Sequence, residues 1–300
     1  MYAIKRELKL NKKETSLMRG MAGFRRFVYN FGLEMVIASW GFEGVNLSDA
    51  KRIDAIKQLF TQVVMKKPEY AWMKKYPSTI YQSVFIALKR AFKRWRQGLS
   101  DFPKQKTKKR GDSFTVYKTS GIYLEKGKPA IPFTNRVVIY SGKKIQLPGL
   151  KEFRLKEEIE FTCSSQTFTV SRTADKWFVS FALDAEKIPP IYHPIERVGV
   201  DLGVKTLATV SDGTRYAMPV STKRAKTKLG KLQWRNRHKV LGSKRLGIKA
   251  SNNARRYYVK LARHHARIGN IRRDTIHKMT TDLSRRVYCI RIEDLNILGM

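Results

Sequence analysis

Two carboxylates are placed where a metal ion could use them. Asp201 interrupts the apolar stretch "RVGVDLGVKTLATVSDGTRY" (197–216), and Glu293 follows the strand pattern of "RVYCIRIEDL" (286–295). Carboxylate oxygens are hard ligands that suit Mg²⁺. Two Mg²⁺ ions held roughly 3.5–4 Å apart can activate water and stabilise the leaving oxygen of a phosphodiester. The residue types therefore predict metal-assisted phosphodiester cleavage, provided that the fold brings the two carboxylates together.

The order of the surrounding elements favours an RNase H-like fold. A hairpin over 197–216 precedes a basic helical region over about 223–286, and the strand leading to Glu293 closes the segment. In that fold the first and fourth strands are parallel neighbours, so a carboxylate on one meets a carboxylate at the end of the other. We predict that Asp201 and Glu293 are catalytic and bind the metal, and that Asp201 is buried in its strand.

Other titratable residues nearby have simpler interpretations. "VDLG" alone is weak evidence, since many strands end in Asp-x-Gly turns, and Asp212 precedes Gly213 as in an ordinary hairpin turn. Asp294 should point to the face opposite Glu293. No carboxylate lies three or four residues from His264, so packing or phosphate contact is expected there rather than metal binding.

The charge of the chain indicates a polyanionic partner. Lys plus Arg number 62 against 24 acidic residues, a net charge of +38, and residues 223–286 hold 21 of these cations but only two acids. Nucleic acid is the first-choice partner for such a chain. A membrane partner is not expected, because no run of about 18 apolar residues exists. The start "MYAIKRELKL" does not resemble a signal peptide, so we expect an intracellular, cytoplasmic protein.

Hydrophobic periodicity predicts an α+β protein of several domains. Residues 1–10 read as a strand, residues 11–101 as a helical module, and residues 102–190 as short strands of a β-barrel or sandwich that the first strand completes. Residues 191–300 then form the nuclease-like domain. The helical module is thereby predicted to be an insertion in the β domain.

Four segments resemble the TnpB family, also called OrfB-type transposases of IS200/IS605-like transposons, which are similar to compact type V CRISPR nucleases. They are "GFRRFVYNFGLE", "VGVDLGVKTLATVSDGTRY", "KLARHHARIGNIRRDTIHKMTTDLSRR" and "IRIEDLNILGM". The resemblance implies an RNA-guided DNA endonuclease with a β-barrel wedge domain, an inserted helical recognition module and a RuvC nuclease domain. Guide RNA and target double-stranded DNA are the implied partners, and Mg²⁺ is the implied cofactor.

The family pattern assigns Asp201 and Glu293 to the first two RuvC carboxylates. The third, and a zinc-binding pair of CxxC motifs, should lie further downstream. Only Cys163 and Cys289 occur and they form no CxxC pair, so no zinc is expected in this chain. We expect a RuvC domain that is incomplete, and a 300-residue chain that does not cleave DNA by itself.

Basic and polar residues near the helices are predicted to bind nucleic acid. In such a protein, guide pairing supplies sequence specificity, while the helical and wedge regions read a short motif beside the target. The predicted contacts are Arg25, Arg26, Asn30, Lys89, Arg90, Lys93, Arg94, Lys104, Lys106, Arg235, Arg237, Lys244, Arg255, Arg263 and Arg272.

A second function stays open at this point. The chain could be a guided DNA-binding protein or repressor without cleavage activity, because the third acid is absent from it. Two carboxylates in the family positions favour the nuclease. A structural RNA-binding protein would explain the charge but neither carboxylate, and direct strand transfer by a cut-and-paste transposase is less favoured. Oligomeric state is not readable from the sequence.

Overall fold

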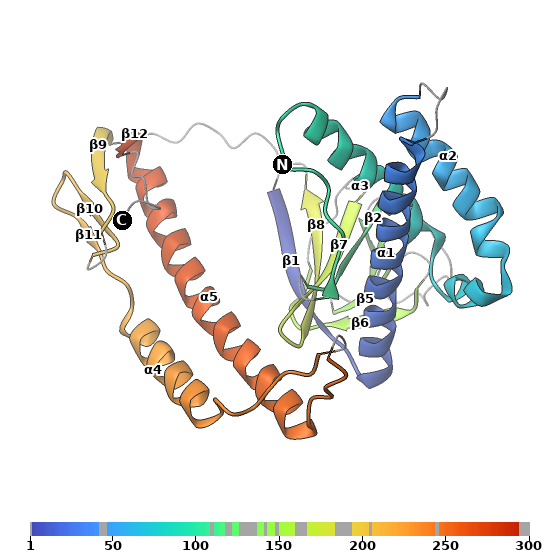
Figure 1. The fold of residues 1–300 in the computed structure, drawn as a ribbon. Helices are drawn as coiled ribbons and strands as arrows, with labels where there is room; N and C mark the ends of the chain where they lie inside the picture. Colours follow the sequence, from blue (N-terminus) through green and yellow to red (C-terminus); the bar gives the residue numbers. More distant parts are fainter. Residues whose placement is uncertain are drawn as a thin grey trace. The chain divides into compact units, whose positions relative to one another are not determined.

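The structure of the chain is a computed structural model. The chain forms two compact units, Met1–Glu186 and Lys187–Met300 (Figure 1). The residues that the structure describes are 2–41, 47–108, 111–117, 122–125, 137–140, 143–147, 150–159, 167–183, 194–203, 206–243 and 246–293.

Helices fill the first part of unit 1. α1 (Lys12–Ser39) starts with a capping box, in which Asn11 and Glu14 each accept a hydrogen bond from the other's backbone N–H. α2 (Asp49–Gln62), the 3₁₀ helices η1 (Val64–Lys66) and η2 (Pro68–Lys75), and α3 (Ser78–Arg96) follow. Gly32 lets α1 and α3 approach closely, because a Cβ there would lie 3.1 Å from Leu88 Cδ2.

An eight-stranded sheet forms the rest of unit 1, in the order β2-β7-β8-β1-β6-β5-β4-β3. β1 pairs with β8 on one side and β6 on the other, so the predicted strand near the N-terminus is confirmed and lies inside the sheet. α1 and α3 pack against β2 (Figure 1). The strands are β1 (Tyr2–Lys9), β2 (Ser113–Tyr117), β3 (Ile122–Glu125), β4 (Val137–Tyr140), β5 (Lys144–Gln146), β6 (Glu152–Leu155), β7 (Thr167–Thr173) and β8 (Lys176–Leu183).

One hydrophobic core joins the helices and the sheet of unit 1. It includes Phe24 and Val28 of α1, Leu88 of α3, and Phe114 and Trp177 of the sheet, each at most 1% exposed. The chain is therefore a mixed α and β protein, with three α-helices placed in sequence between β1 and β2. No ladder between β2 and β3 is found among the described residues, so closure of the sheet into a barrel stays a prediction. The domain limits at residues 10, 101 and 190 also stay predictions.

Unit 2 combines a small sheet with two basic helices. β9 (Ile195–Asp201), β10 (Ala208–Val210) and β11 (Arg215–Tyr216) are antiparallel, and β12 (Val287–Ile292) pairs with β9 in parallel. α4 (Val220–Arg235) and α5 (Asn252–Arg286) follow β11 and precede β12 in the sequence. The two helices pack against each other (Figure 1). The described helices include none that is long and apolar enough to cross a bilayer.

Candidate active site

The parallel ladder between β9 and β12 brings the two predicted catalytic carboxylates to one place. Ile292 lies opposite Val200, and one further residue along each strand reaches Glu293 and Asp201. Both side chains line a single open concavity of about 510 Å³. The juxtaposition required by the sequence argument is therefore present in the fold.

Asp201 is exposed, which corrects the prediction that it is buried. Val198 and Val200 face the small core with Leu283 and Val287, while the alternate positions on β9 point to the other face of the sheet. The described part of unit 2 leaves that other face uncovered. The apolar run around Asp201 thus buries one side of the strand only.

Gly199 contributes backbone but no side chain to the lining of the concavity. A Cβ built there would lie 3.9 Å from the Ser211 Cβ, and Arg291 is opposite Gly199 in the ladder. Neither neighbour was predicted from the sequence, although residues two positions from Asp201 and Glu293 share their face of the sheet. The lining residues are Gly199, Val200, Asp201, Thr209, Val210, Ser211, Arg291, Ile292 and Glu293.

Hydrogen bonds to Ser211, the residue after β10, help to fix the strand that carries Asp201. The Gly199 N–H donates to Ser211 Oγ at 3.0 Å, and the Ser211 N–H donates to the Gly199 carbonyl at 2.9 Å. Thr209 lies directly opposite Asp201. The carboxylate is consequently held on a paired, central strand rather than on a loop.

The turn between β10 and β11 is tied to the end of α5. Asp212 accepts a hydrogen bond from the Thr214 N–H at 2.8 Å, and Gly213 has φ +87°, so this is the turn expected from the sequence. Arg286 donates to Asp212 Oδ2 at 3.3 Å, to Asp282 Oδ2 at 3.0 Å and to Tyr216 Oη at 2.9 Å, and the Tyr216 hydroxyl donates to Asp282. Because Arg286 directly precedes β12, this network fixes where that strand begins.

The pKa values of the two acids in this network are below their ordinary value. The bond from Thr214 lowers the pKa of Asp212, the bond from Tyr216 lowers that of Asp282, and Arg286 adds to both shifts. A carboxyl whose pKa is lowered by folding stabilises the fold above its unfolded pKa, and this stabilisation is lost as the pH falls through the folded value.

We expect Arg286→Gln to lower the melting temperature of unit 2 by a few degrees at pH 7. The difference from the unchanged protein should begin to shrink below about pH 4, the ordinary carboxyl pKa, and keep shrinking as the pH falls through the lower pKa values of the folded chain, where both charged partners of Arg286 are lost. Thermal unfolding followed by circular dichroism between pH 3 and 8 measures this. Arg285→Gln removes the same charge at the adjacent exposed position and should show a smaller effect; equal losses for both variants would contradict the role given to Arg286.

The oxygen atoms around the Asp201–Glu293 concavity are ligands of the kind that a hard cation prefers, but they are few. The concavity offers two carboxylates, with the hydroxyls of Thr209 and Ser211 beside them. Within the described residues, no group of three or more His, Cys, Asp or Glu side chains could hold a metal ion. The oxygen donors fit Mg²⁺ in kind.

Three of the predicted nucleic-acid contacts hold unit 1 together instead of facing solvent freely. Arg25 donates to the Ser113 carbonyl and hydroxyl at 3.1 and 2.9 Å, and burial lowers its pKa. Arg26 forms an ion pair with the buried Asp112. Asn30 exchanges hydrogen bonds with the backbone of Lys106 at 3.1 and 2.8 Å. These side chains therefore attach α1 to the segment that leads into β2.

The basic end of α3 and the following segment are more accessible. Lys89 forms an ion pair with Asp54 at 2.6 Å, and Arg90 lies over the Tyr117 ring at 5.3 Å. Lys104 forms an exposed ion pair with Asp101, and Lys106 lies over the Tyr29 ring. The exposed side chains Lys93 and Arg94 lie in the last turn of α3.

Five of the six remaining predicted contacts are exposed on or near the helices of unit 2. Arg237 stacks on the Trp234 ring at 4.7 Å, and that ring is 67% exposed, so it could also meet a base. Lys244 lies outside the described residues. The exposed predicted contacts here are Arg235, Arg237, Arg255, Arg263 and Arg272.

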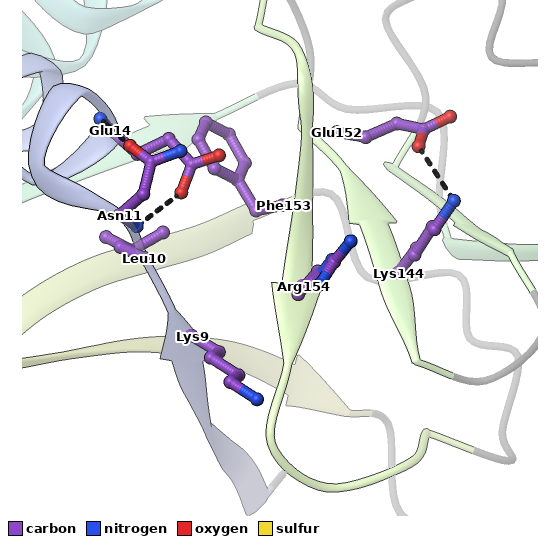
Figure 2. Close-up of a pocket in the computed structure, with 8 residues that line it drawn as sticks. All are labelled: Lys9, Leu10, Asn11, Glu14, Lys144, Glu152, Phe153 and Arg154. Atoms are coloured by element: carbon purple, nitrogen blue, oxygen red, sulfur yellow. Dashed lines mark hydrogen bonds and ion pairs between the residues drawn. The ribbon is translucent and has the colours of Figure 1, made fainter.

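A second concavity, of about 530 Å³, lies beside the start of α1 in unit 1 (Figure 2). Lys9, Arg154 and Lys144 face one another on β1, β6 and β5, so three cations form one row. Two carboxylates share the lining: Glu14 is held by the capping box, and Glu152 forms an ion pair with Lys144 at 3.8 Å (Figure 2). The charge of this concavity is therefore mixed.

Comparison with known proteins gives a consistent set of relatives. The family profile OrfB_IS605, described as "Probable transposase", matches residues 180–300. A protein of Escherichia coli (strain K12) named "Putative RNA-guided DNA endonuclease InsQ" is 30% identical over 302 residues, covering 100% of this chain and 67% of the relative. A "Putative RNA-guided DNA endonuclease" of Streptomyces pristinaespiralis is 27% identical over 280 residues, covering 93% of this chain and 63% of the relative.

Among solved structures, a Cas12f1–sgRNA–target DNA complex resembles the chain in fold. The TM-score is 0.56 at 15% identity, and the match covers 95% of this chain and 66% of that one. The chain thus spans about two thirds of the length of the relatives it matches.

Proposed function

We propose, from the premise that this chain belongs to the OrfB_IS605 (TnpB) family of transposases, that it carries part of an RNA-guided DNA endonuclease. The observation that carries the proposal is the parallel pairing of β9 with β12, which places Asp201 and Glu293 in one concavity. Two carboxylates at neighbouring strand ends have no packing purpose on an exposed face, whereas they suit a divalent metal. Guide RNA and target DNA are the proposed partners, and the cytoplasm is the proposed location.

Asp201 and Glu293 would hold Mg²⁺ in this proposal. Bound there, the metal supplies Lewis acidity toward an oxygen of the phosphodiester. The chain's own residues do the rest: Gly199 leaves room for the phosphate, and Arg291 offers it a charged donor. A two-metal site needs further oxygen ligands, so we propose that complete cleavage requires a third carboxylate in addition to these two.

The basic helices and the exposed cations at the end of α3 would hold the nucleic acid. We propose that α4 and α5 contact the phosphates of the RNA–DNA heteroduplex, which such proteins recognise by shape and charge. Lys93 and Arg94, with Lys89 and Arg90 beside them, are proposed to lie near the motif next to the target. Arg25, Arg26 and Asn30 are proposed to support that surface from within, given their internal contacts.

Sequencing the RNA that copurifies with the protein from its host tests the guide. One discrete transcript that overlaps the end of the gene supports guide binding, and a smear of bulk RNA contradicts it. Cleavage of a matching DNA target is then assayed with a protein that extends this chain to the length of its relatives.

A guided DNA-binding protein without cleavage activity is the second candidate. The observation in its favour is that the concavity offers only two carboxylates among the described residues. Target binding without Mg²⁺-dependent cleavage, in a protein of the relatives' length, would select it.

Affinity for nucleic acid should depend steeply on salt under either candidate. With several phosphate contacts made by the chain's cations, we expect a loss on the order of 10³–10⁵ in affinity between 50 and 200 mM salt. Fluorescence anisotropy with a labelled oligonucleotide measures it. A flat response would remove nucleic acid as the main partner of this chain.

A further inference from the structure

A smaller concavity between α4 and α5 is lined by cations and by no carboxylate. It measures about 210 Å³. Arg224 and Lys228 are one helical turn apart on α4, and His264 and Arg267 occupy one face of α5 opposite them. Ser221, in the first turn of α4, adds a hydroxyl to the lining, and the small buried side chain of Ala225 lets the helices approach. None of these positions was among the contacts predicted from sequence, apart from the phosphate contact considered for His264.

This arrangement is electrostatically unfavourable without a ligand. Like charges one turn apart on a helix destabilise it, and here a second helix presents another cation to the same space. Arg224, Lys228 and Arg267 form no ion pair with a carboxylate among the residues described. The charges in the α1 concavity, by contrast, are partly offset by Glu14 and Glu152 (Figure 2). An anion bound in the α4–α5 concavity would offset these charges.

The chemistry of the lining selects a phosphate group among anions. Two guanidinium groups can each donate two parallel hydrogen bonds to phosphate oxygens, and the ammonium and hydroxyl groups add single donors. A volume of about 210 Å³ is large enough for a phosphate group with part of its sugar. A polynucleotide backbone presents such groups singly and at regular spacing.

We infer that the concavity lined by Ser221, Arg224, Lys228, His264 and Arg267 binds a backbone phosphodiester of the guide RNA or the target DNA. The inference deepens the proposed function and rests on it in one respect, namely that the partner is a polynucleotide. It assigns a fixed phosphate position to a surface that is otherwise only broadly basic.

The test uses the 300-residue chain and three labelled probes: a 20-nucleotide RNA, a 20-nucleotide single-stranded DNA and a 20-base-pair DNA. Arg224→Gln with Arg267→Gln should lower affinity at 100 mM salt by about tenfold or more. It should also make the salt slope shallower by about 0.7–0.9, since one phosphate contact is lost. A larger loss for RNA identifies the guide as the source of the phosphate, and a larger loss for duplex DNA identifies the target.

The matched control is Lys226→Gln with Arg273→Gln, which removes the same charge from exposed positions on the same two helices. It should lower affinity by less than about threefold. Equal losses for the two double variants, or no loss for the first, would overturn the site. Cleavage is assayed separately, in a guide-loaded protein that extends this chain to the length of its relatives. Normal probe binding by the first variant, together with guided cleavage by the longer protein, would refute the site and leave the proposed function standing. Lost probe binding, with no guided cleavage by the longer protein, would support the site and count against the proposed function.

Thermal unfolding without nucleic acid checks that any loss of affinity is not caused by unfolding of the variant. Relief of repulsion should leave the first double variant as stable as the unchanged chain, or more so. If the Gln double variant melts at a lower temperature, the binding test uses Arg224→Lys with Arg267→Lys instead. This second pair of substitutions keeps the charge and removes only the planar donors. It should bind about threefold more weakly with an unchanged salt slope, and unaltered affinity would overturn the inference.

Discussion

Asp201→Ala is expected to abolish target cleavage, lowering its rate on the order of 10³-fold or more, while leaving guide and target binding intact. The carboxylate lies on a paired central strand and lines the same concavity as Glu293, so its loss removes half of the carboxylate donors there. Losing a group that acts only on the reacting phosphate lowers the rate without weakening binding. Binding could even strengthen slightly, because one negative charge near the DNA is removed.

The experiment uses a protein that extends this chain to the length of its relatives, loaded with guide RNA and supplied with Mg²⁺. Asp274→Asn is the matched control, since it neutralises an exposed carboxylate on α5 that pairs with Lys278 on the surface of the same helix. Its cleavage rate should stay within about twofold of the unchanged protein. Cleavage by Asp201→Ala at the rate of the control variant would contradict the catalytic role of Asp201. No cleavage by the unchanged protein would favour a guided DNA-binding protein without cleavage activity.

A readout besides cleavage separates a metal-binding role from a structural one. If Asp201 and Glu293 hold Mg²⁺, then Mg²⁺ should raise the melting temperature of the unchanged protein and not that of the variant. The same melting temperature for both proteins without metal would show that the exposed carboxylate does not support the fold.

Local patterns in the sequence predicted elements and their order, because these depend on neighbours a few residues apart. The strand at 2–10, the hairpin turn at Asp212 and the strand before Glu293 all follow from alternation and turn chemistry. The exposure of Asp201 was missed because Gly199 reads as one more apolar residue in a run. In the sheet, Val198 and Val200 face the core, and Gly199 and Asp201 face outward.

Contacts between distant segments could not be predicted in this way. Arg26 lies on the polar face of α1 in the sequence pattern, and for this reason it was predicted to bind nucleic acid. Nothing within a helical turn reveals that Asp112, 86 residues later, is buried beside it. The cluster of Arg224 and Arg267 was hidden for the same reason, since it exists only where α4 packs on α5.

Asp112→Ala is expected to destabilise unit 1 by about 3 kcal/mol, which is typical when one partner of a buried ion pair is removed. The Asp112 side chain is 2% exposed and lies within ion-pair distance of Arg26 and, at 2.8 Å, of Arg172. Its loss leaves two partly buried guanidinium groups without their common counterion. Urea unfolding at pH 7 measures the change, and Asp101→Ala, whose pair with Lys104 is exposed, should cost at most about 1 kcal/mol.

A double-mutant cycle then decides what Arg26 does. If its charge serves Asp112, Arg26→Gln should cost less in the Asp112→Asn background than in the unchanged chain, with a coupling energy of about 1 kcal/mol or more. Oligonucleotide affinity should be unaltered by Arg26→Gln at temperatures where the variant is folded. A side chain that neutralises a buried carboxylate has no charge left to offer a phosphate. Independent effects of the two substitutions on stability, together with a clear loss of oligonucleotide affinity for Arg26→Gln, would therefore contradict this role and return Arg26 to the nucleic-acid surface.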